Sequence, residues 1–212
     1  MSKNAHIIFL KYPESGKVKT RLGESIGHSK AAEFYRLLVE KILMATVDST
    51  TDILLFIEPY EKLNKFKDWL GGSFKYYPQE QSDLGERMFK ALETAFSEGY
   101  DKCILTGSDI PELNSDITSD AFEKLDESDA VLGRAEDGGY YLIGFNKNKL
   151  TDKVFKGIKW SCENVFDETM RVFNQINYIV IHTEILSDLD TLEDLESMRE
   201  NLREIIGSTG VL

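Results

Sequence analysis

Residues 6–21 have the sequence HIIFLKYPESGKVKTR, in which an apolar run is followed by a basic loop. The apolar run, His6–Leu10, has the length and composition of a buried β-strand. The loop contains one glycine, four basic side chains and one acid: Gly16, Lys11, Lys17, Lys19, Arg21 and Glu14. Ligands of open α/β sheets bind beyond the carboxyl ends of the strands. This stretch therefore predicts an α/β sheet that holds a small anion after its first strand.

Six more apolar runs recur along the chain and predict further strands: Asp52–Ile57, Phe74–Tyr77, Lys102–Leu105, Ala130–Leu132, Tyr140–Phe145 and Tyr178–His182. Between them, apolar residues repeat at helical spacing, as at Leu84, Met88, Leu92 and Ala95. Alternating strands and helices are typical of a mainly parallel sheet with helices on both faces. The chain has no internal repeat, linker or composition break. We therefore expect residues 1–212 to form one α/β domain.

The last helix is predicted from its cap and its apolar stripe. Thr191 followed by Asp194 resembles a capping box, which satisfies the first backbone N–H groups of a helix. The stripe comprises Leu192, Leu195, Met198, Leu202 and Ile205. Glycine is common just past a helix end, so the pattern predicts one helix that ends at Gly207.

Composition and charge exclude several classes of protein. The chain has 212 residues, of which 42% are hydrophobic, and its formal net charge is -12. A charge of this sign repels nucleic-acid backbones and anionic membrane surfaces. The longest apolar runs are far shorter than the roughly 18 residues that a membrane-spanning helix needs. We expect neither nucleic-acid binding nor a membrane span, and we interpret the first apolar run as a strand rather than a signal-peptide core.

The two cysteines, Cys103 and Cys162, have neither metal-ligand spacing nor the pattern of a disulfide framework. Unpaired thiols are typical of a reducing compartment. The cysteine content therefore predicts a cytoplasmic protein.

The basic loop suits a phosphate group. Gly16 permits close approach of the backbone, and Lys17 and Lys19 supply mobile point charges. Arg21 offers a planar fork that matches phosphate oxygens. The spacing matches neither a Walker P-loop nor a dinucleotide fingerprint. The alternative is a basic turn that only faces water, as short charge clusters usually do.

A candidate metal ligand follows the run Lys102–Leu105. Gly107 and Ser108 permit a tight turn, which would expose Asp109 at the edge of the sheet. A carboxylate in that position can bind a hard divalent cation. The alternative is an aspartate that only forms the turn or caps a helix.

Another acidic segment, residues 188–191, precedes the last helix. If the sheet brings it beside Asp109, then Asp188 or Asp190 could share one Mg²⁺ or Mn²⁺ with Asp109. The basic loop and the cation together would compensate the charge of a nucleoside di- or triphosphate. For Asp190 the alternative is a helix cap.

The segment before the Tyr140–Phe145 run contains Asp137, Gly138 and Gly139. The glycines permit positive φ and backbone access, although Asp-Gly is also the commonest hairpin turn. Trp160 could stack on a base or a sugar, and its alternative is a place in the core or at its rim.

Five segments taken together resemble the DUF2064 family: residues 11–22, 83–88, 107–111, 133–144 and 188–191. This family comprises small bacterial glycosyltransferase-A-like proteins, related to the guanylyltransferases of coenzyme F420 synthesis and to nucleotide-diphospho-sugar transferases. The resemblance implies a seven-stranded, mostly parallel mixed sheet with a nucleotide at its carboxyl edge. Two departures are Ser15 and Arg134, which stand where the family often has proline.

The resemblance also implies roles for individual residues. The matches to the family's basic, phosphate-binding loop and its neighbours are Lys11, Gly16, Lys17, Lys19, Arg21, Gly107 and Ser108. Asp109 matches a metal carboxylate, and Asp188 or Asp190 matches a second acidic motif. The acceptor-side residues are Asp137, Gly138, Gly139, Tyr140 and Trp160. Within this scheme Asp109 and Asp137 are the candidate catalytic residues.

We therefore expect a metal-dependent transferase whose donor is a nucleoside-diphosphate sugar or a nucleoside triphosphate. Its acceptor would be a small molecule that the sequence does not identify, as it does not identify the oligomeric state. One alternative is a non-catalytic nucleotide-binding or accessory protein that retains the fold. Another is a basic loop that docks a protein partner.

Overall fold

The computed structural model describes residues 2–160, 162–200 and 202–210. Within them the chain forms a seven-stranded sheet in the order β3-β2-β1-β4-β6-β5-β7. The strands are β1 (Asn4–Lys11), β2 (Thr51–Glu58), β3 (Lys75–Pro78), β4 (Lys102–Thr106), β5 (Ala130–Arg134), β6 (Tyr140–Asn146) and β7 (Val180–His182). All seven predicted strands are confirmed, with small shifts at their ends.

The sheet is mixed. β1 pairs in parallel with β2 and β4, and the pairs β2–β3 and β5–β7 are also parallel. β6 runs antiparallel to both of its neighbours, β4 and β5. The expected mostly parallel mixed sheet is therefore confirmed. The carboxyl ends of β1 and β4 lie side by side, because these two strands are neighbours.

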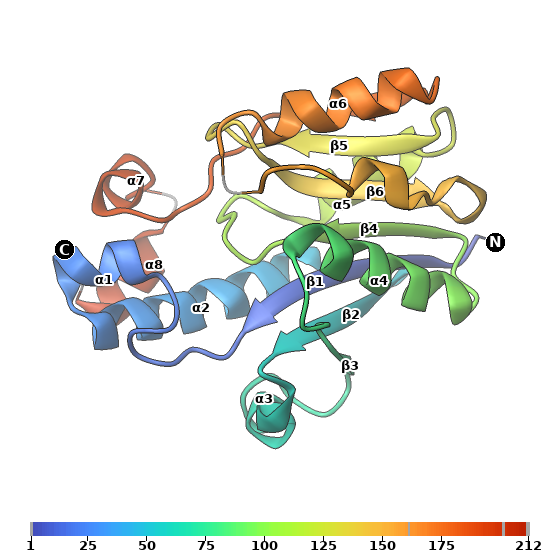
Figure 1. The fold of residues 1–212 in the computed structure, drawn as a ribbon. Coiled ribbons are helices and arrows are strands. Elements are labelled where there is room, and N and C mark those ends of the chain that lie inside the picture. Colours follow the sequence, from blue (N-terminus) through green and yellow to red (C-terminus); the bar gives the residue numbers. More distant parts are fainter. Residues whose placement is uncertain (1, 161, 201, 211–212) are drawn as a thin grey trace.

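Helices cover both faces of the sheet (Figure 1). The helices of the described residues are α1 (Thr20–Ile26), α2 (His28–Thr46), α3 (Leu63–Leu70), α4 (Leu84–Ser97), α5 (Ser115–Lys124), α6 (Val165–Gln175), α7 (Leu192–Ser197) and α8 (Arg203–Thr209). Short 3-10 turns occupy Tyr60–Lys62, Lys147–Lys149 and Asp152–Val154. In Figure 1, α4 and α6 lie in front of the sheet and α2 lies behind it, while α1, α7 and α8 lie beyond the carboxyl end of β1.

The alternation of side chains along the strands explains the two layers of the core. In β4, Ile104 belongs to the core layer that contains Leu38 of α2, whereas Leu105 belongs to the layer on the opposite face, which contains Leu92 of α4. Successive side chains of a strand point to opposite faces, so an apolar strand supplies both layers. Such burial on both faces is typical of parallel strands covered by helices.

The end of the chain differs from its prediction. Thr191 and Asp194 do form a capping box, at the start of α7. The predicted single helix is wrong, because α7 ends at Ser197 and α8 begins at Arg203. Gly207 lies inside α8, which ends at Gly210 with a left-handed φ of 58°. Glycine weakens a helix interior by about 1 kcal/mol without breaking it, whereas a left-handed residue does end it.

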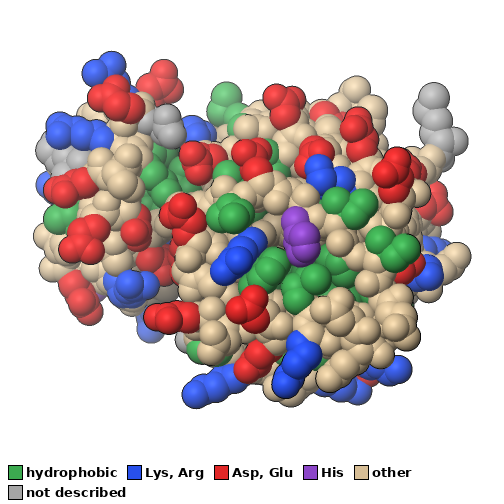
Figure 2. Space-filling model, turned by 90° about the horizontal axis from the view of Figure 1, so that it is seen from above, with side chains coloured by type: hydrophobic (Ala, Val, Ile, Leu, Met, Phe, Trp, Pro, Cys, Tyr) green, Lys and Arg blue, Asp and Glu red, His purple; other side chains and the backbone are tan. Residues whose placement is uncertain are grey.

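No helix in these residue ranges is long and apolar enough to cross a membrane. On the face shown in Figure 2, acidic and basic side chains are interspersed rather than gathered by sign. A continuous basic area, as a polynucleotide backbone requires, is not present on that face.

Candidate functional site

A cleft of about 540 Å³ opens at the carboxyl ends of β1 and β4. Most of the predicted site residues line it: Lys11, Lys17, Lys19, Arg21, Gly107, Ser108, Asp109, Tyr140 and Asp190. The others lie outside its lining: Gly16, Asp137, Gly138, Gly139, Trp160 and Asp188. The sheet thus brings the basic loop and two of the predicted acidic residues to one place.

The basic loop leaves β1 at Lys11 and returns to the cleft at α1. Gly16 has a positive φ of 76°, which lets the chain turn at little cost. The backbone N–H of Lys17 donates to the carbonyl oxygen of Glu14 at 2.9 Å, and the Glu14 carboxylate forms an ion pair with Lys62. These contacts fix the turn and leave the side chains of Lys11 and Lys17 exposed.

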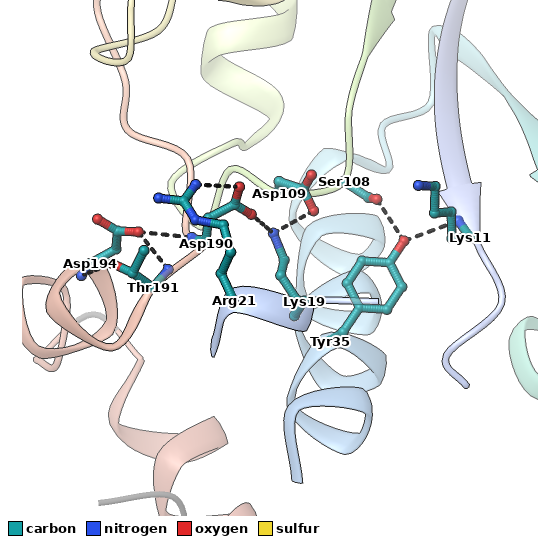
Figure 3. Close-up of polar contacts among 9 residues, drawn as sticks. All are labelled: Lys11, Lys19, Arg21, Tyr35, Ser108, Asp109, Asp190, Thr191 and Asp194. Atoms are coloured by element: carbon teal, nitrogen blue, oxygen red, sulfur yellow. Dashed lines mark hydrogen bonds and ion pairs between the residues drawn. The ribbon is translucent and has the colours of Figure 1, made fainter. Parts of the chain in front are cut away.

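Lys19 differs from the other basic residues of the loop. Its Nζ lies 2.7 Å from Asp109 Oδ1 and 3.0 Å from Asp190 Oδ1, and its side chain is only 3% exposed. Figure 3 shows the lysine pointing between the two carboxylates. Burial acts to lower the pKa of Lys19, but the charges of Asp109 and Asp190 outweigh it and raise that pKa above its usual value. The side chain is therefore a cation enclosed by two anions.

The backbone of Lys19 is left-handed, with φ 45° and ψ 48°, at the N-cap of α1. Residues other than glycine and asparagine rarely adopt this conformation, which costs about 1–3 kcal/mol. The neighbouring Val18 is buried and anchors the loop. The surrounding contacts thus hold Lys19 in a strained conformation that directs its side chain inward.

Asp109 follows β4 through Gly107 and the buried Ser108. The hydroxyl groups of Ser108 and Tyr35 are 2.8 Å apart, and the backbone N–H of Lys11 donates to the Tyr35 hydroxyl at 3.1 Å. Tyr35 therefore connects the end of β1 to the turn that carries Asp109 (Figure 3). Burial raises the pKa of Tyr35 to about 12, so its hydroxyl stays protonated.

Asp190 does not cap the following helix, so that alternative is wrong. Thr191 is the N-cap of α7, and the carboxylate of Asp194 accepts the backbone N–H groups of Asp190 and Thr191. The side chain of Asp190 is left to contact Lys19 and, at 3.4 Å, Arg21. A backbone hydrogen bond of 3.0 Å from Leu189 N–H to the carbonyl of Asp109 ties the two acidic segments together.

Asp188 lies beside these residues but makes no ion pair within the described part of the chain. Its carboxyl group is half-buried. Burial, together with the charges of Asp137 and Asp190, raises its pKa to about 6. Of the two candidates in this segment, Asp190 is the one whose carboxylate contacts Lys19 together with Asp109.

The β5–β6 turn, residues 135–139, forms the hairpin that its Asp-Gly sequence permits. Gly138 has a φ of 89°, and a Cβ built on it would lie 2.0 Å from the carbonyl oxygen of Glu163. The carboxylate of Asp137 accepts the backbone N–H of Gly139 at 2.8 Å. The turn is therefore packed against the segment before α6, outside the cleft.

Trp160 is half-buried and packs against Tyr140, with ring centroids 6.3 Å apart. A Cβ built on Gly85 would lie 2.5 Å from the Trp160 ring, so the indole rests on the first turn of α4. Tyr140 itself lines the cleft. The indole thus supports one wall of the cleft through Tyr140.

Gln79 and Arg87 are among the residues that line the cleft without having been predicted. Gln79 donates to the carbonyl oxygens of Leu10 and Phe56, and its own amide oxygen accepts from Arg87 at 3.2 Å. The Nε atom of Arg87 is buried and has no partner among the described residues. The segment 83–88 was part of the family resemblance, and the arginine within it was the available signal.

Metal-ligating side chains are few at this site. In the described ranges, no group of three or more His, Cys, Asp or Glu side chains is arranged to hold a metal ion. Asp109 and Asp190 nevertheless hold a cationic nitrogen between them. Mg²⁺ commonly takes only one or two protein carboxylates and completes its shell with phosphate oxygens and water. The Lys19 ammonium lies between these two carboxylates, which together with phosphate oxygens and water would be enough to hold Mg²⁺ or Mn²⁺.

Comparison with known proteins places the chain among related sequences and folds. A family model described as an uncharacterized protein conserved in bacteria (DUF2064) matches residues 42–162. No curated protein sequence matches the chain. A crystal structure from Desulfovibrio desulfuricans G20, with the provisional name nucleotide-diphospho-sugar transferase, is 38% identical with a TM-score of 0.90. The alignment covers 99% of this chain and 97% of that one.

More distant structures share the fold alone. One is a CMP:2-keto-3-deoxy-manno-octonic acid synthetase in complex with CTP, with 10% identity, a TM-score of 0.59 and coverage of 96% of this chain and 99% of that chain. Another is the 4-diphosphocytidyl-2C-methyl-D-erythritol synthase of Anaerococcus prevotii DSM 20548. It has 15% identity and a TM-score of 0.57, and the alignment covers 95% of this chain and 99% of that chain. The fold is thus that of proteins named as nucleotidyl and sugar-nucleotide transferases.

Proposed function

The chain belongs to the DUF2064 family, and we propose that it is a metal-dependent transferase with a nucleotide donor. The donor is a nucleoside-diphosphate sugar or a nucleoside triphosphate. The observation that carries this proposal is the meeting of the basic loop with Asp109 and Asp190 in one cleft, at the carboxyl edge of the sheet. The names of the structural relatives support the same class of reaction.

The phosphate groups of the donor would lie against Lys11, Lys17 and Arg21. All three side chains line the cleft and are exposed. Arg21 contacts Asp190 at 3.4 Å while two-thirds of its side chain remains exposed, so its guanidinium can also reach a ligand. Gly107 and Ser108 complete this side of the site. Charge-assisted hydrogen bonds from arginine to phosphate are shorter and stronger than neutral ones.

Asp109 and Asp190 would hold Mg²⁺ or Mn²⁺ together with phosphate oxygens. When bound, such a cation neutralises the charge that develops on the departing phosphate group. The side chains of Lys17 and Arg21 act in the same sense on pyrophosphate or nucleoside diphosphate. Catalysis on this scheme comes from position and electrostatics, because no side chain is required to form a covalent bond to the donor.

The acceptor would approach from the side of the β5–β6 turn. Tyr140 lines the cleft, and Trp160 packs behind it. Asp137, at the turn with Gly138 and Gly139, is exposed and is our candidate for orienting the acceptor or accepting its proton. A small-molecule acceptor would share the cleft of about 540 Å³ with the donor.

We also propose that residues 1–212 are one domain of a cytoplasmic protein. The single seven-stranded sheet, whose strands are drawn from Asn4 to His182, supports the first statement. The two free cysteines, of which Cys103 is buried, support the second, because unpaired thiols persist in reducing compartments.

A thermal-shift panel tests the proposal. Nucleoside di- and triphosphates and nucleotide sugars are each added with and without Mg²⁺ or Mn²⁺. A ligand at 100 times its Kd stabilises the folded state by about 2.7 kcal/mol, so a true donor raises Tm clearly and more so with metal. Product formation with candidate acceptors then separates an enzyme from a non-catalytic nucleotide-binding protein. No stabilisation by any nucleotide would contradict the proposal.

A further inference from the structure

Two lysines of the basic loop, two positions apart, have opposite environments. Lys17 is exposed, whereas the Lys19 side chain is 3% exposed and contacts two carboxylates. The left-handed backbone at Lys19 turns its side chain away from the open part of the loop. Since a lysine seldom adopts this conformation, the inward position of Lys19 depends on what it binds there.

The two carboxylates that bind Lys19 remain accessible from solvent. The side chain of Asp109 is 47% exposed and that of Asp190 is 36% exposed. Both use their Oδ1 atoms for the lysine, which occupies the space where their negative charges meet. A divalent cation that reached the same two oxygens from solvent would find that space already filled by an ammonium group.

Two positive charges cannot share this position at low cost, because like charges a few ångströms apart repel strongly in a partly buried site. Binding of a divalent cation to Asp109 and Asp190 therefore requires Lys19 to leave. Without another anion nearby, the displaced ammonium loses its partners. The phosphate groups of a donor in the same cleft would supply new ones, since Lys19 lines that cleft.

We infer that Lys19 is an internal cation which a divalent metal ion displaces from Asp109 and Asp190, and that the nucleotide stabilises the displaced form. The part that concerns the nucleotide rests on the function proposed above. Metal and nucleotide then bind with positive coupling. The coupling is reciprocal, because each ligand must raise the affinity of the other by the same factor. Lys19 thereby makes the site take up metal chiefly when a donor is present.

The first test measures Mn²⁺ binding to the nucleotide-free protein by paramagnetic resonance. The Lys19→Met variant keeps the length of the side chain but removes its charge. Lys67→Met removes the same charge from an exposed lysine of α3 that does not line the cleft. We expect Lys19→Met to bind Mn²⁺ about tenfold more tightly than the wild type. Lys67→Met should stay within about twofold. Equal affinities for the two variants, or no Mn²⁺ binding by Lys19→Met, would overturn the inference.

The second test follows the lysine itself in the wild-type protein. An amine-reactive reagent is applied with and without Mg²⁺, and modification of each lysine is measured by mass spectrometry, with exposed Lys17 as the internal standard. Without Mg²⁺, Lys19 should be protected from the reagent. At saturating Mg²⁺ it should become reactive. Protection that persists with Mg²⁺ would show that the ion pair is permanent and would overturn the inference.

The two proposals fail differently. Suppose that no nucleotide binds, but that Lys19→Met tightens Mn²⁺ binding and Mg²⁺ makes Lys19 reactive. The displacement of Lys19 by metal is then supported and the proposed function is wrong. If instead a nucleotide binds together with metal while Lys19 stays protected in every condition, the proposed function is supported and the displacement of Lys19 is wrong.

Discussion

The loop between β1 and α1 and the turn between β5 and β6 lie at the same edge of the sheet but are built differently. Each contains a glycine with positive φ, at Gly16 and Gly138. A Cβ on Gly16 would meet nothing within 4 Å, whereas one on Gly138 would lie 2.0 Å from a backbone oxygen. The first loop is open and carries its charges into a cleft, and the second is packed against its neighbours.

The strand order explains the difference. β1 lies beside β4, so the loop after β1 meets the turn that carries Asp109. β5 is separated from β4 by the antiparallel β6, and its turn meets the segment before α6 instead. A glycine next to charged residues thus has no fixed meaning in a sequence. The neighbouring strands decide whether it lies in a ligand site or in a packed turn.

The largest expected effect is on stability and separates the two glycines. Gly138→Ala should lower the free energy of unfolding by about 3 kcal/mol, because the left-handed backbone and the overlap with Glu163 both add cost. Gly16→Ala should lower it by about 1 kcal/mol, from backbone strain alone. Urea denaturation of both variants measures the difference. Equal losses would show that the β5–β6 turn is as open as the first loop.

The next effect is on ligand binding and separates two exposed arginines. Arg21→Ala should weaken binding of the nucleotide found in the panel by about 1.5–3 kcal/mol, the range of a charge-assisted hydrogen bond. A smaller loss is expected for Lys17→Ala, since a mobile ammonium is more easily replaced. Arg134→Ala, at the end of β5, is the control and should bind normally. Calorimetric titration gives all three affinities, and a larger loss at Arg134 than at Arg21 would reverse our assignment of the phosphate side.

The smallest effect concerns Asp188, whose pKa is raised by burial and by the negative charges of Asp137 and Asp190. Its pKa is raised to about 6, above the unfolded value of about 3.9. The folded state therefore favours the protonated form, and this contribution to stability is lost as pH rises from about 4 through 6.

Asp188→Asn should remove this loss. We expect the variant to gain about 1 kcal/mol relative to the wild type between pH 4 and pH 7, a value reduced because the group is only half-buried. Unfolding curves across this pH range provide the measurement. Asp129→Asn serves as a control of opposite sign, because Lys149 and a backbone N–H hold the pKa of Asp129 below its usual value. Parallel pH profiles for Asp188→Asn and the wild type would contradict the shift.

The strands were predictable because each is a compact apolar run whose side chains fill both layers of the core. The cap at Thr191 was predictable because its partner, Asp194, is three residues away. The break between α7 and α8 was not, since the apolar stripe of residues 192–205 continues across it. Local patterns thus predicted local structure, and they failed where one stripe serves two short helices.

The candidate site was predictable in content but not in its pairing. The sequence assigned Lys19 to phosphate and Asp109 and Asp190 to metal, whereas the structure joins the three in one ion-pair cluster. Lys19 and Asp190 are 171 positions apart in the sequence. The left-handed backbone of Lys19, which directs its side chain toward Asp190, could not be predicted, because lysine rarely adopts that conformation. Tyr35 was missed because a tyrosine on the apolar stripe of α2 resembles an ordinary core residue.

The central claim is that Asp109 holds a metal ion together with the donor nucleotide, and one titration tests it most directly. The nucleotide from the panel is titrated by calorimetry into the wild type, Asp109→Asn and Asp137→Asn, each with and without Mg²⁺. We predict that Mg²⁺ tightens binding about tenfold or more in the wild type and in Asp137→Asn, and has no effect in Asp109→Asn. A folded Asp109→Asn protein that retains the full Mg²⁺ effect would contradict the account.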